Sequence, residues 1–226
     1  MRLNHLLWLA ALAGATPLAA ADVAHPAVVE LYQSQGCSSC PPADAVLNGI
    51  ADRPDVLALS FAVTYWDDLG WKDTFAAPAF TQRQWDFARA GGRGSVATPQ
   101  VIVNGRGVLT GNRRADVDAA IAQFDRGLSG PSLTIADRSV SVGAGHGPAT
   151  LWLVRYDPRT IAVPIRAGEN GGRTIPHRNI VRQLVKLGQW NGRPGRFAIP
   201  ASPAGLRSAV LLQAGTGGPI IASGRL

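Results

Sequence analysis

The chain contains only two cysteines, Cys37 and Cys40, and two residues separate them. A disulfide that braces a fold normally links distant segments, because the stabilisation grows with the length of the loop that the bond closes. A bond between these two cysteines closes almost no loop. We therefore expect the pair to serve chemistry, with an inert disulfide as the less favoured alternative.

The cysteines follow a predicted strand and precede a predicted helix. Residues 28–32 are rich in β-forming residues, residues 33–36 have the composition of a turn, and residues 43–51 offer a modest apolar helical face. The apolar run at 56–63 suits a buried strand parallel to the first. A C-x-x-C motif at the strand–helix junction of such a β-α-β unit is typical of thioredoxin-like redox proteins.

The alternation continues to about residue 128. Four further elements are predicted: a helix over 78–90, strands over 100–103 and 108–109 joined by the hairpin signal Asn104-Gly105, and an amphipathic helix over 116–124. The resulting order, β-α-β-α-β-β-α, predicts an α/β thioredoxin-like domain over residues 22–128.

After residue 128 the sequence consists of short β-like runs separated by Gly and Pro. The runs lie at 132–136, 139–143, 149–156, 161–166, 196–199 and 208–213. They predict a mostly antiparallel, sandwich-like β domain over 129–226, and an α+β protein overall. Residues 178–188 fit either a helix or a strand, and the context favours a strand.

The first 21 residues have the pattern of a secretory signal peptide: Arg2, an apolar run over 6–13, and the small residues Ala19-Ala20-Ala21. The apolar run is much shorter than the ~20 residues that span a bilayer, so cleavage is favoured over a membrane anchor. We therefore expect a periplasmic or secreted protein with no stable membrane insertion after signal cleavage.

Charge is distributed unevenly, because residues 22–130 carry a net charge of −3 and residues 131–226 one of +9. This difference also favours two domains. The arginines of the second half are scattered singly among apolar residues, so a solvated face is favoured over contact with an anion or a membrane surface. No nucleic-acid partner is expected.

The start of a helix is a favourable place for a reactive thiol, because its free N–H groups and the positive end of its dipole stabilise the thiolate. Pro41 and Pro42 suit the first helical turn and so place the helix start close to the cysteines. We expect Cys37 to be the exposed attacking sulfur and Cys40 the shielded resolving one. The expected partners are thiols and disulfides of proteins or small molecules.

Two further positions are expected to complete this site. Pro99 lies where thioredoxin-like folds have a cis-proline, which would hold the Thr98 backbone beside Cys37 to pair with an extended substrate. An ordinary trans-proline is the alternative. Glu30 interrupts the apolar strand before the dithiol, where a buried carboxylate would shuttle the proton of Cys40 and a solvent-facing one would not.

A polar and aromatic loop follows the second predicted strand and is expected to wall the dithiol, because sites in open α/β sheets lie outside the carboxyl ends of the strands. Trp66, Asp67 and Lys72 are its candidates for positioning substrate or tuning the thiolate. Packing of the aromatic ring in the core is the alternative.

A weaker candidate site contains Glu169, Arg173 and His177, in a segment that first predicts a hairpin turn. No metal ligand set is expected, since the mature chain has only three histidines, no methionine and no second ligand pair at a zinc-finger spacing. No cofactor is expected either.

The run from Val29 to Asp44, with Cys-Ser-Ser-Cys-Pro-Pro within it, resembles a bacterial exported family that is catalogued as domain of unknown function 1223 and is thioredoxin-like. The other similar segments are Tyr65-Trp66-Asp67, Leu69-Gly70-Trp71-Lys72-Asp73, Thr98-Pro99-Gln100 and Gly168-Glu169-Asn170. The resemblance covers nearly all of the mature chain and implies the fold, the export and the dithiol residues. It implies little about substrate or redox direction, because the Ser-Ser between the cysteines and the longer stretch before Pro99 differ from thioredoxin itself.

Together these features predict an exported thiol–disulfide oxidoreductase that uses a Cys-Ser-Ser-Cys dithiol. The alternative is a non-enzymatic protein on a thioredoxin scaffold, which would bind a soft metal, sense redox state or contact a partner.

Overall fold

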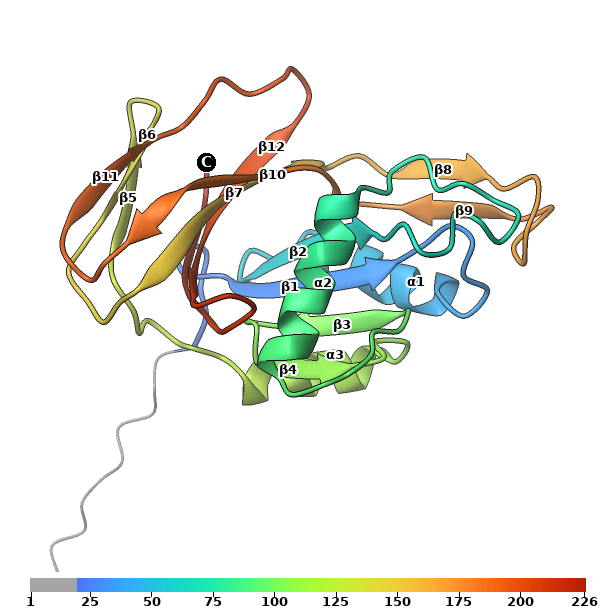
Figure 1. Ribbon diagram of the computed structural model, residues 1–226, viewed down its shortest axis with the longest axis horizontal. Helices are drawn as coiled ribbons and strands as arrows, with labels where there is room; N and C mark the ends of the chain where they lie inside the picture. Colours follow the sequence, from blue (N-terminus) through green and yellow to red (C-terminus); the bar gives the residue numbers. More distant parts are fainter. Residues whose placement is uncertain (1–19) are drawn as a thin grey trace, which may run out of the picture.

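The structure, a computed structural model, describes residues 20–226 (Figure 1). Nearly all of the predicted signal peptide, residues 1–21, therefore lies outside the described residues. The described helices are α1 (Pro41–Ile50), α2 (Pro78–Ala90) and α3 (Arg114–Gln123). The described strands are β1 (Ala27–Gln33), β2 (Val56–Ala62), β3 (Gln100–Val103), β4 (Gly107–Leu109), β5 (Leu133–Ala136), β6 (Ser139–Val142), β7 (Ala149–Asp157), β8 (Ile161–Pro164), β9 (Thr174–His177), β10 (Ile180–Trp190), β11 (Gly195–Ala198), β12 (Arg207–Ala214) and β13 (Ile220–Arg225).

The protein is α+β, and its centre is a mixed eight-stranded sheet in the order β13-β12-β7-β10-β2-β1-β3-β4. β1 pairs in parallel with β2 and antiparallel with β3. Every residue of β1 and β2 is buried, as expected for strands covered on both faces. The element order predicted for the first half of the chain is confirmed.

The second half of the chain extends the same sheet. β10 lies parallel to β2 through the pair Ile180↔Ser60, and the Asn179 side-chain amide donates to the Ala58 carbonyl at 2.9 Å. β7, β12 and β13 continue the sheet in antiparallel pairing. The strand predicted over 178–188 is thus confirmed, and the sheet runs without a break across the predicted boundary at residue 128.

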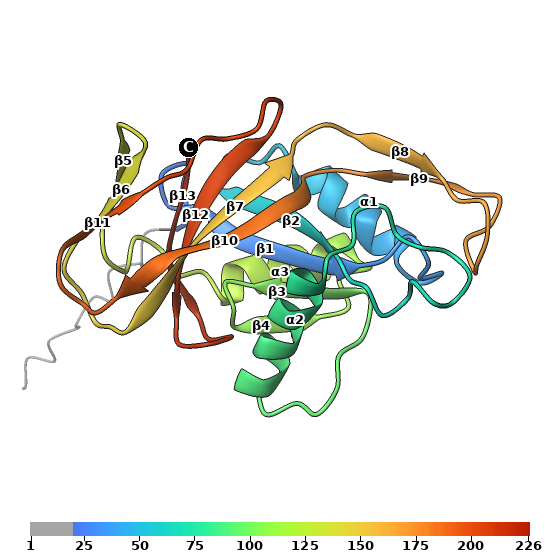
Figure 2. The same cartoon turned by 45° about the horizontal axis from the view of Figure 1, so that its top comes forward.

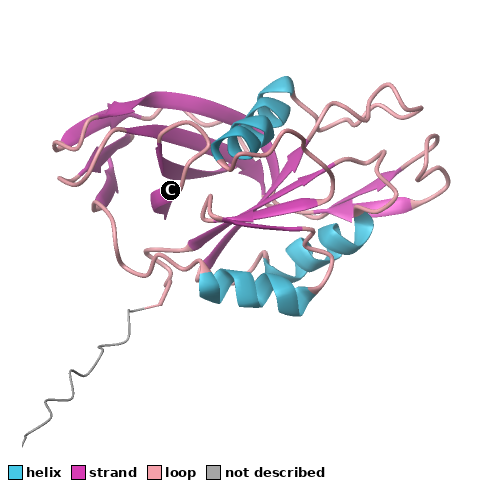
Figure 3. Cartoon of the chain, turned by 60° about the horizontal axis from the view of Figure 1, so that its bottom comes forward, coloured by secondary structure: helices cyan, strands magenta, loops and turns pink. Residues whose placement is uncertain are grey.

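Helices cover the two faces of the first half of the sheet unequally, as Figure 3 shows. α1 and α3 pack on one face through Ala43, Leu47, Val117 and Ile121, against the odd-numbered residues of β1. α2 packs on the other face, where Phe80 and Phe87 meet the even-numbered residues of β1 together with residues of β2 and β10. Because successive side chains of a strand point to opposite faces, one strand supplies both cores.

The strands β11, β6 and β5 form a second, antiparallel sheet. Its inner side packs on β7, β10 and β12 around a core that includes Val140, Leu153, Trp190 and Val210. In this part of the chain, two sheets therefore pack face to face. Trp190 is buried in this core, whereas Trp152 is half-buried against the separate core that contains Phe80 and Phe87 of α2.

The strands β8 and β9 form a separate hairpin between β7 and β10, and this hairpin extends along α1 (Figures 1 and 2). Its apolar residues Val163, Ile165 and Ile175 pack against Trp71 and Phe75 of the loop before α2. The Asn48 side chain of α1 donates to the Pro176 carbonyl of β9 at 2.8 Å. The hairpin thereby brings residues 165–177 to the end of the sheet where the cysteines lie.

Candidate functional site

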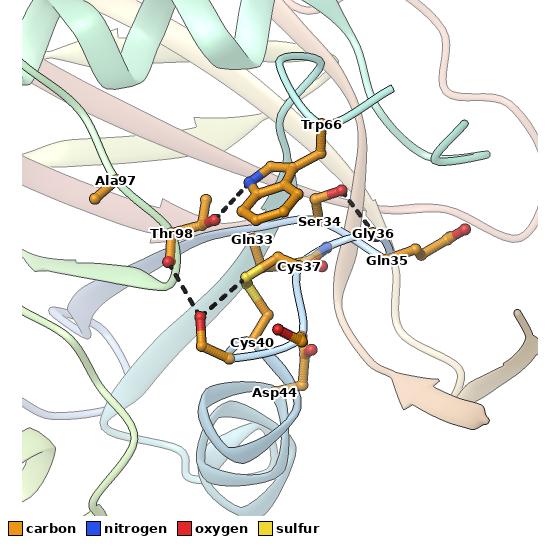
Figure 4. Close-up of a disulfide and its surroundings, with 12 residues drawn as sticks. Gln33, Ser34, Gln35, Gly36, Cys37, Cys40, Asp44, Trp66, Ala97 and Thr98 are labelled. Atoms are coloured by element: carbon orange, nitrogen blue, oxygen red, sulfur yellow. Dashed lines mark hydrogen bonds between the residues drawn. A yellow bond between two sulfur atoms is a disulfide. The ribbon is translucent and has the colours of Figure 1, made fainter. Parts of the chain in front are cut away.

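Cys37 and Cys40 form a disulfide between the end of β1 and the first turn of α1, with 5.4 Å between their Cα atoms (Figure 4). The helix begins at Pro41, as the two prolines predict. Pro41 and Pro42 carry no N–H, and the N–H groups of Ala43 and Asp44 donate to the Cys40 carbonyl. The N–H groups of Ala43 and Asp44 are therefore not free to donate to a thiolate. The helix start stabilises a thiolate through the positive end of the helix dipole.

Both cysteines are completely buried, with an exposed fraction of 0%. The expectation that Cys37 is the exposed sulfur is wrong for this disulfide form. Two contacts contribute to this burial: a turn of the distant hairpin, residues 168–170, is hydrogen-bonded to the backbone that carries Cys37, and the Ser39 hydroxyl lies 3.3 Å from the Cys37 sulfur. Asn170 is itself buried, and its amide donates to the carbonyls of Gln35 and Cys37 at 2.9 and 2.8 Å.

The same turn is fastened to the residues between the cysteines. The Glu169 carboxylate accepts hydrogen bonds from the Ser38 hydroxyl at 2.6 Å and from the Ser38 N–H at 3.1 Å. These bonds stabilise the charged carboxylate and lower the pKa of Glu169. Arg173 donates to Asn170 at 2.8 Å and so orients the amide.

Two glycines allow the 168–170 turn to approach the loop after β2. Gly168 (φ +70°) and Gly70 (φ +97°) have left-handed backbone conformations, which favour glycine. A Cβ on Gly70 would lie 3.3 Å from the Gly168 Cα, and a Cβ on Gly168 would lie 3.2 Å from the Trp71 Cβ. Larger side chains at these positions would push the two segments apart.

The Thr98–Pro99 segment lies beside the disulfide, and its peptide bond is cis as predicted. The Ser39 hydroxyl is 3.3 Å from the Cys37 sulfur and 3.5 Å from the Thr98 carbonyl oxygen. The Trp66 indole N–H donates to the Thr98 hydroxyl at 2.8 Å (Figure 4). The structure therefore brings Thr98, Pro99 and Trp66 together with the dithiol segment.

Asp67 and Lys72 are placed differently from Trp66. The Asp67 carboxylate accepts the N–H of Asp73 at 3.1 Å and so shapes its own loop, while Lys72 is exposed. Neither side chain has a hydrogen bond to the cysteine segment within residues 20–226. Asp73, in contrast, accepts the N–H of Gln35 at 2.7 Å and holds the turn that precedes Cys37.

Glu30 is buried on the face of the sheet that packs against α2, opposite to α1. It forms a two-bond ion pair with Arg83, at 2.7 and 2.8 Å, and accepts the hydroxyl of Tyr32 at 2.8 Å. Of the two environments expected for Glu30, the buried one is confirmed and the solvent-facing one is wrong. Its carboxylate is held by Arg83 and Tyr32. Burial works against the charge of Arg83, but the attraction of Glu30 outweighs it and raises the pKa of Arg83.

A second buried acid lies on the face of α1 next to the cysteines. Asp44 and His177 are 3% and 0% exposed, and Asp44 Oδ1 lies 3.3 Å from His177 Nδ1. Burial raises the pKa of Asp44. Burial alone would lower the pKa of His177, but Asp44 and Asp73 together outweigh it, so that this pKa is raised. Sequence reasoning did not single out Asp44, although a carboxylate in the first turn of the helix after C-x-x-C was a usable signal.

Glu169, Arg173 and His177 thus all reach the surroundings of the dithiol, but through three different partners: Ser38, Asn170 and Asp44. Within residues 20–226, no group of three or more His, Cys, Asp or Glu side chains has a geometry that would hold a metal ion. None of the helices described there is long and apolar enough to cross a membrane.

The fold and site define a class of protein: an α+β protein with one mixed eight-stranded sheet and a C-x-x-C disulfide at the start of its first helix. The chain belongs to the family described as Protein of unknown function (DUF1223), whose profile matches residues 28–213. No curated protein matches the chain.

Two solved structures are similar to it. The crystal structure of a protein from Agrobacterium tumefaciens is 34% identical in sequence, with a TM-score of 0.75 over 90% of this chain and 94% of that one. HBP35 of Porphyromonas gingivalis is 13% identical, with a TM-score of 0.60 over 90% of this chain and 75% of that one. The second likeness concerns the fold alone.

Proposed function

We propose that this protein is an exported thiol–disulfide oxidoreductase built on a thioredoxin-like scaffold, with Cys37 and Cys40 as its redox pair. The observation that carries the proposal is the disulfide itself, which closes a loop too short to brace the fold and lies at a helix N-terminus. The scaffold is supported by the order β2-β1-β3-β4, in which β1 and β2 are parallel and β3 and β4 antiparallel, with α2 on one face and α1 and α3 on the other.

In the reducing direction, the Cys37 thiolate attacks a disulfide of a protein or small molecule and forms a mixed disulfide. One substrate sulfur leaves as a thiol or thiolate. Cys40 then loses its proton and attacks the Cys37 sulfur, which releases the second substrate sulfur and restores the disulfide seen here. The two electrons that the dithiol loses are those that the substrate gains.

Three groups support the attacking role of Cys37. The helix dipole favours its thiolate, the Ser39 hydroxyl lies 3.3 Å from its sulfur, and the Thr98–Pro99 segment offers backbone groups beside it for an extended substrate. The burial of Cys37 requires that Ser39 or the 168–170 turn move before a substrate enters. Export is supported by the signal-peptide pattern of residues 1–21, and it would place the pair in a compartment where disulfides form.

The test is to trap the first intermediate. The variant Cys40→Ala, reduced and mixed with an oxidised protein substrate, is expected to accumulate a mixed disulfide through Cys37 that a thiol reagent cleaves. Cys37→Ala is the matched control and is expected to trap nothing. The proposal fails if Cys40→Ala forms no mixed disulfide and its Cys37 also resists alkylation.

A further inference from the structure

The buried pair of Asp44 and His177 is unusually poor in hydrogen bonds. Asp44 Oδ2 and both ring nitrogens of His177 have no hydrogen-bond partner among residues 20–226, and the 3.3 Å contact between Asp44 Oδ1 and His177 Nδ1 lacks hydrogen-bond alignment. Buried polar atoms without partners cost free energy, so such a pair calls for a physical explanation. A group that exchanges protons with a neighbour during a reaction supplies one.

Cys40 lies one helical turn before Asp44, at the N-terminal end of α1. Cys40 has helical backbone angles, φ −77° and ψ −34°, and the N–H of Asp44 donates to its carbonyl at 3.1 Å. Residues four apart lie on the same helical face, and helical side chains lean toward the N-terminus of the helix. Asp44 therefore leans toward Cys40, and Figure 4 shows its side chain extending from α1 toward the disulfide.

We propose that Asp44, held by His177, is the group that accepts the proton of Cys40 when the mixed disulfide is resolved and returns it when the disulfide is reduced. This inference rests on the proposed function and assigns to Asp44 the proton transfer that the sequence assigned to Glu30. Glu30 is unsuited to it, because its carboxylate is fully engaged by Arg83 and Tyr32 on the opposite face of the sheet.

The Cys40 thiol gives its proton to the Asp44 carboxylate, the Cys40 sulfur forms a bond to the Cys37 sulfur, and the bond between Cys37 and the substrate sulfur breaks. The substrate leaves as a thiolate with the electron pair of that bond. His177 stabilises the Asp44 carboxylate before the transfer and loses part of that attraction afterwards.

Other charged groups also act on the pair. Asp73 attracts the charged form of His177 from the loop before α2, and Asp67 lies close enough to act on Asp73. The Arg182 guanidinium of β10 lies over the Phe75 ring, 5.0 Å from its centroid, and the Phe75 ring is nearly perpendicular to the His177 ring. Burial raises the pKa of Asp44, which makes its carboxylate a stronger base for a thiol.

A small aromatic disulfide, 5,5′-dithiobis(2-nitrobenzoic acid), separates the two steps. Reduced protein releases one coloured thiolate when Cys37 attacks and a second when Cys40 resolves. Asp44→Asn is expected to slow the second release by about 100-fold near pH 7, within the usual range of general-base catalysis. The difference is expected to vanish above about pH 9.5, where a thiol of ordinary pKa ionises without help.

The matched control is Asp52→Asn, which removes an exposed carboxylate just beyond the C-terminal end of α1. It is expected to leave both phases unchanged at every pH. His177→Gln removes the partner of the carboxylate and is expected to move the inflection of the second phase to higher pH. If Asp44→Asn matches the wild type, or slows the second phase equally at every pH, the inference is wrong.

A second measurement needs only the wild-type protein. The ring protons of His177, followed by NMR, are expected to titrate at different pH values in the oxidised and the dithiothreitol-reduced protein, and identical titrations would overturn the inference. A different result would overturn the proposed function itself: the reduced wild-type protein would release no thiolate from the reagent.

Discussion

The buried ion pair of Glu30 and Arg83 offers a sharp test of how the α2 face is held to the sheet. The substitution Glu30→Gln keeps the shape of the side chain but leaves the guanidinium, 4% exposed, without its carboxylate. Breaking a buried pair by removing one partner typically costs about 3–5 kcal/mol, because the remaining charge is buried and uncompensated. For a protein of this size, that corresponds to a fall in Tm of roughly 6–20 °C.

The free energy of unfolding would be measured by urea denaturation near pH 7, for the wild type, Glu30→Gln and two controls. Tyr32→Phe removes one hydroxyl from the same carboxylate and leaves the ion pair in place, so its loss is expected to be smaller, about 1.5–3 kcal/mol. The double variant Glu30→Leu/Arg83→Met removes both charges and is expected to recover stability relative to Glu30→Gln. A loss below about 1 kcal/mol for Glu30→Gln would refute the reasoning.

Three further predictions concern the surroundings of the dithiol. Ser39→Ala removes a hydroxyl 3.3 Å from the Cys37 sulfur and is expected to raise the pKa of the reduced Cys37 by about one unit, measured from the pH dependence of alkylation; an unchanged profile would contradict this. Glu169→Gln weakens the bonds from Ser38 and is expected to speed reduction of the disulfide by dithiothreitol several-fold, whereas Asp137→Asn, on a distant exposed turn, is expected to have no effect. The pKa of His177 is raised in the folded protein, so its ionisation stabilises the fold fully below its ordinary pKa of about 6.5, and this stabilisation is lost as the pH rises through the folded-state value. The stability difference between the wild type and His177→Gln is therefore expected to shrink between pH 6 and pH 9 in urea denaturation, and a constant difference would count against the ion pair.

Local patterns in the sequence predicted most of the first half of the fold. The apolar run of β2, the strand before the cysteines and the amphipathic helices each have a periodicity that a window of a few residues reveals. The two prolines after Cys40 fixed the start of α1 for a similarly local reason.

The pairing of β10 with β2 was not predictable in this way, because it joins Ile180 to Ser60 across 120 residues. The exposure of Cys37 was misjudged for the same reason, since a turn that contributes to its burial belongs to a hairpin more than 130 residues away. No pattern in the cysteine motif or in its neighbouring residues predicts a contact with that distant segment.

The partner of Glu30 did leave a signal in the sequence. Arg83 lies between Phe80 and Phe87 at helical spacing, so a positive charge interrupts the apolar face of α2 just as a negative charge interrupts β1. Two opposite charges on faces that must both be buried predict an ion pair, since an unpaired buried charge is too costly. This combination would have placed Glu30 away from the dithiol.

The most direct test of a redox role for Cys37 and Cys40 is the reduction potential of their disulfide, measured by equilibrating the purified protein, produced without residues 1–21, with glutathione and dithiothreitol buffers. A redox-active pair is expected to interconvert reversibly at a potential between about −120 and −270 mV, the range of thioredoxin-like oxidoreductases. A disulfide that stays oxidised below about −300 mV while the protein remains folded would be a structural bond, and would contradict the account.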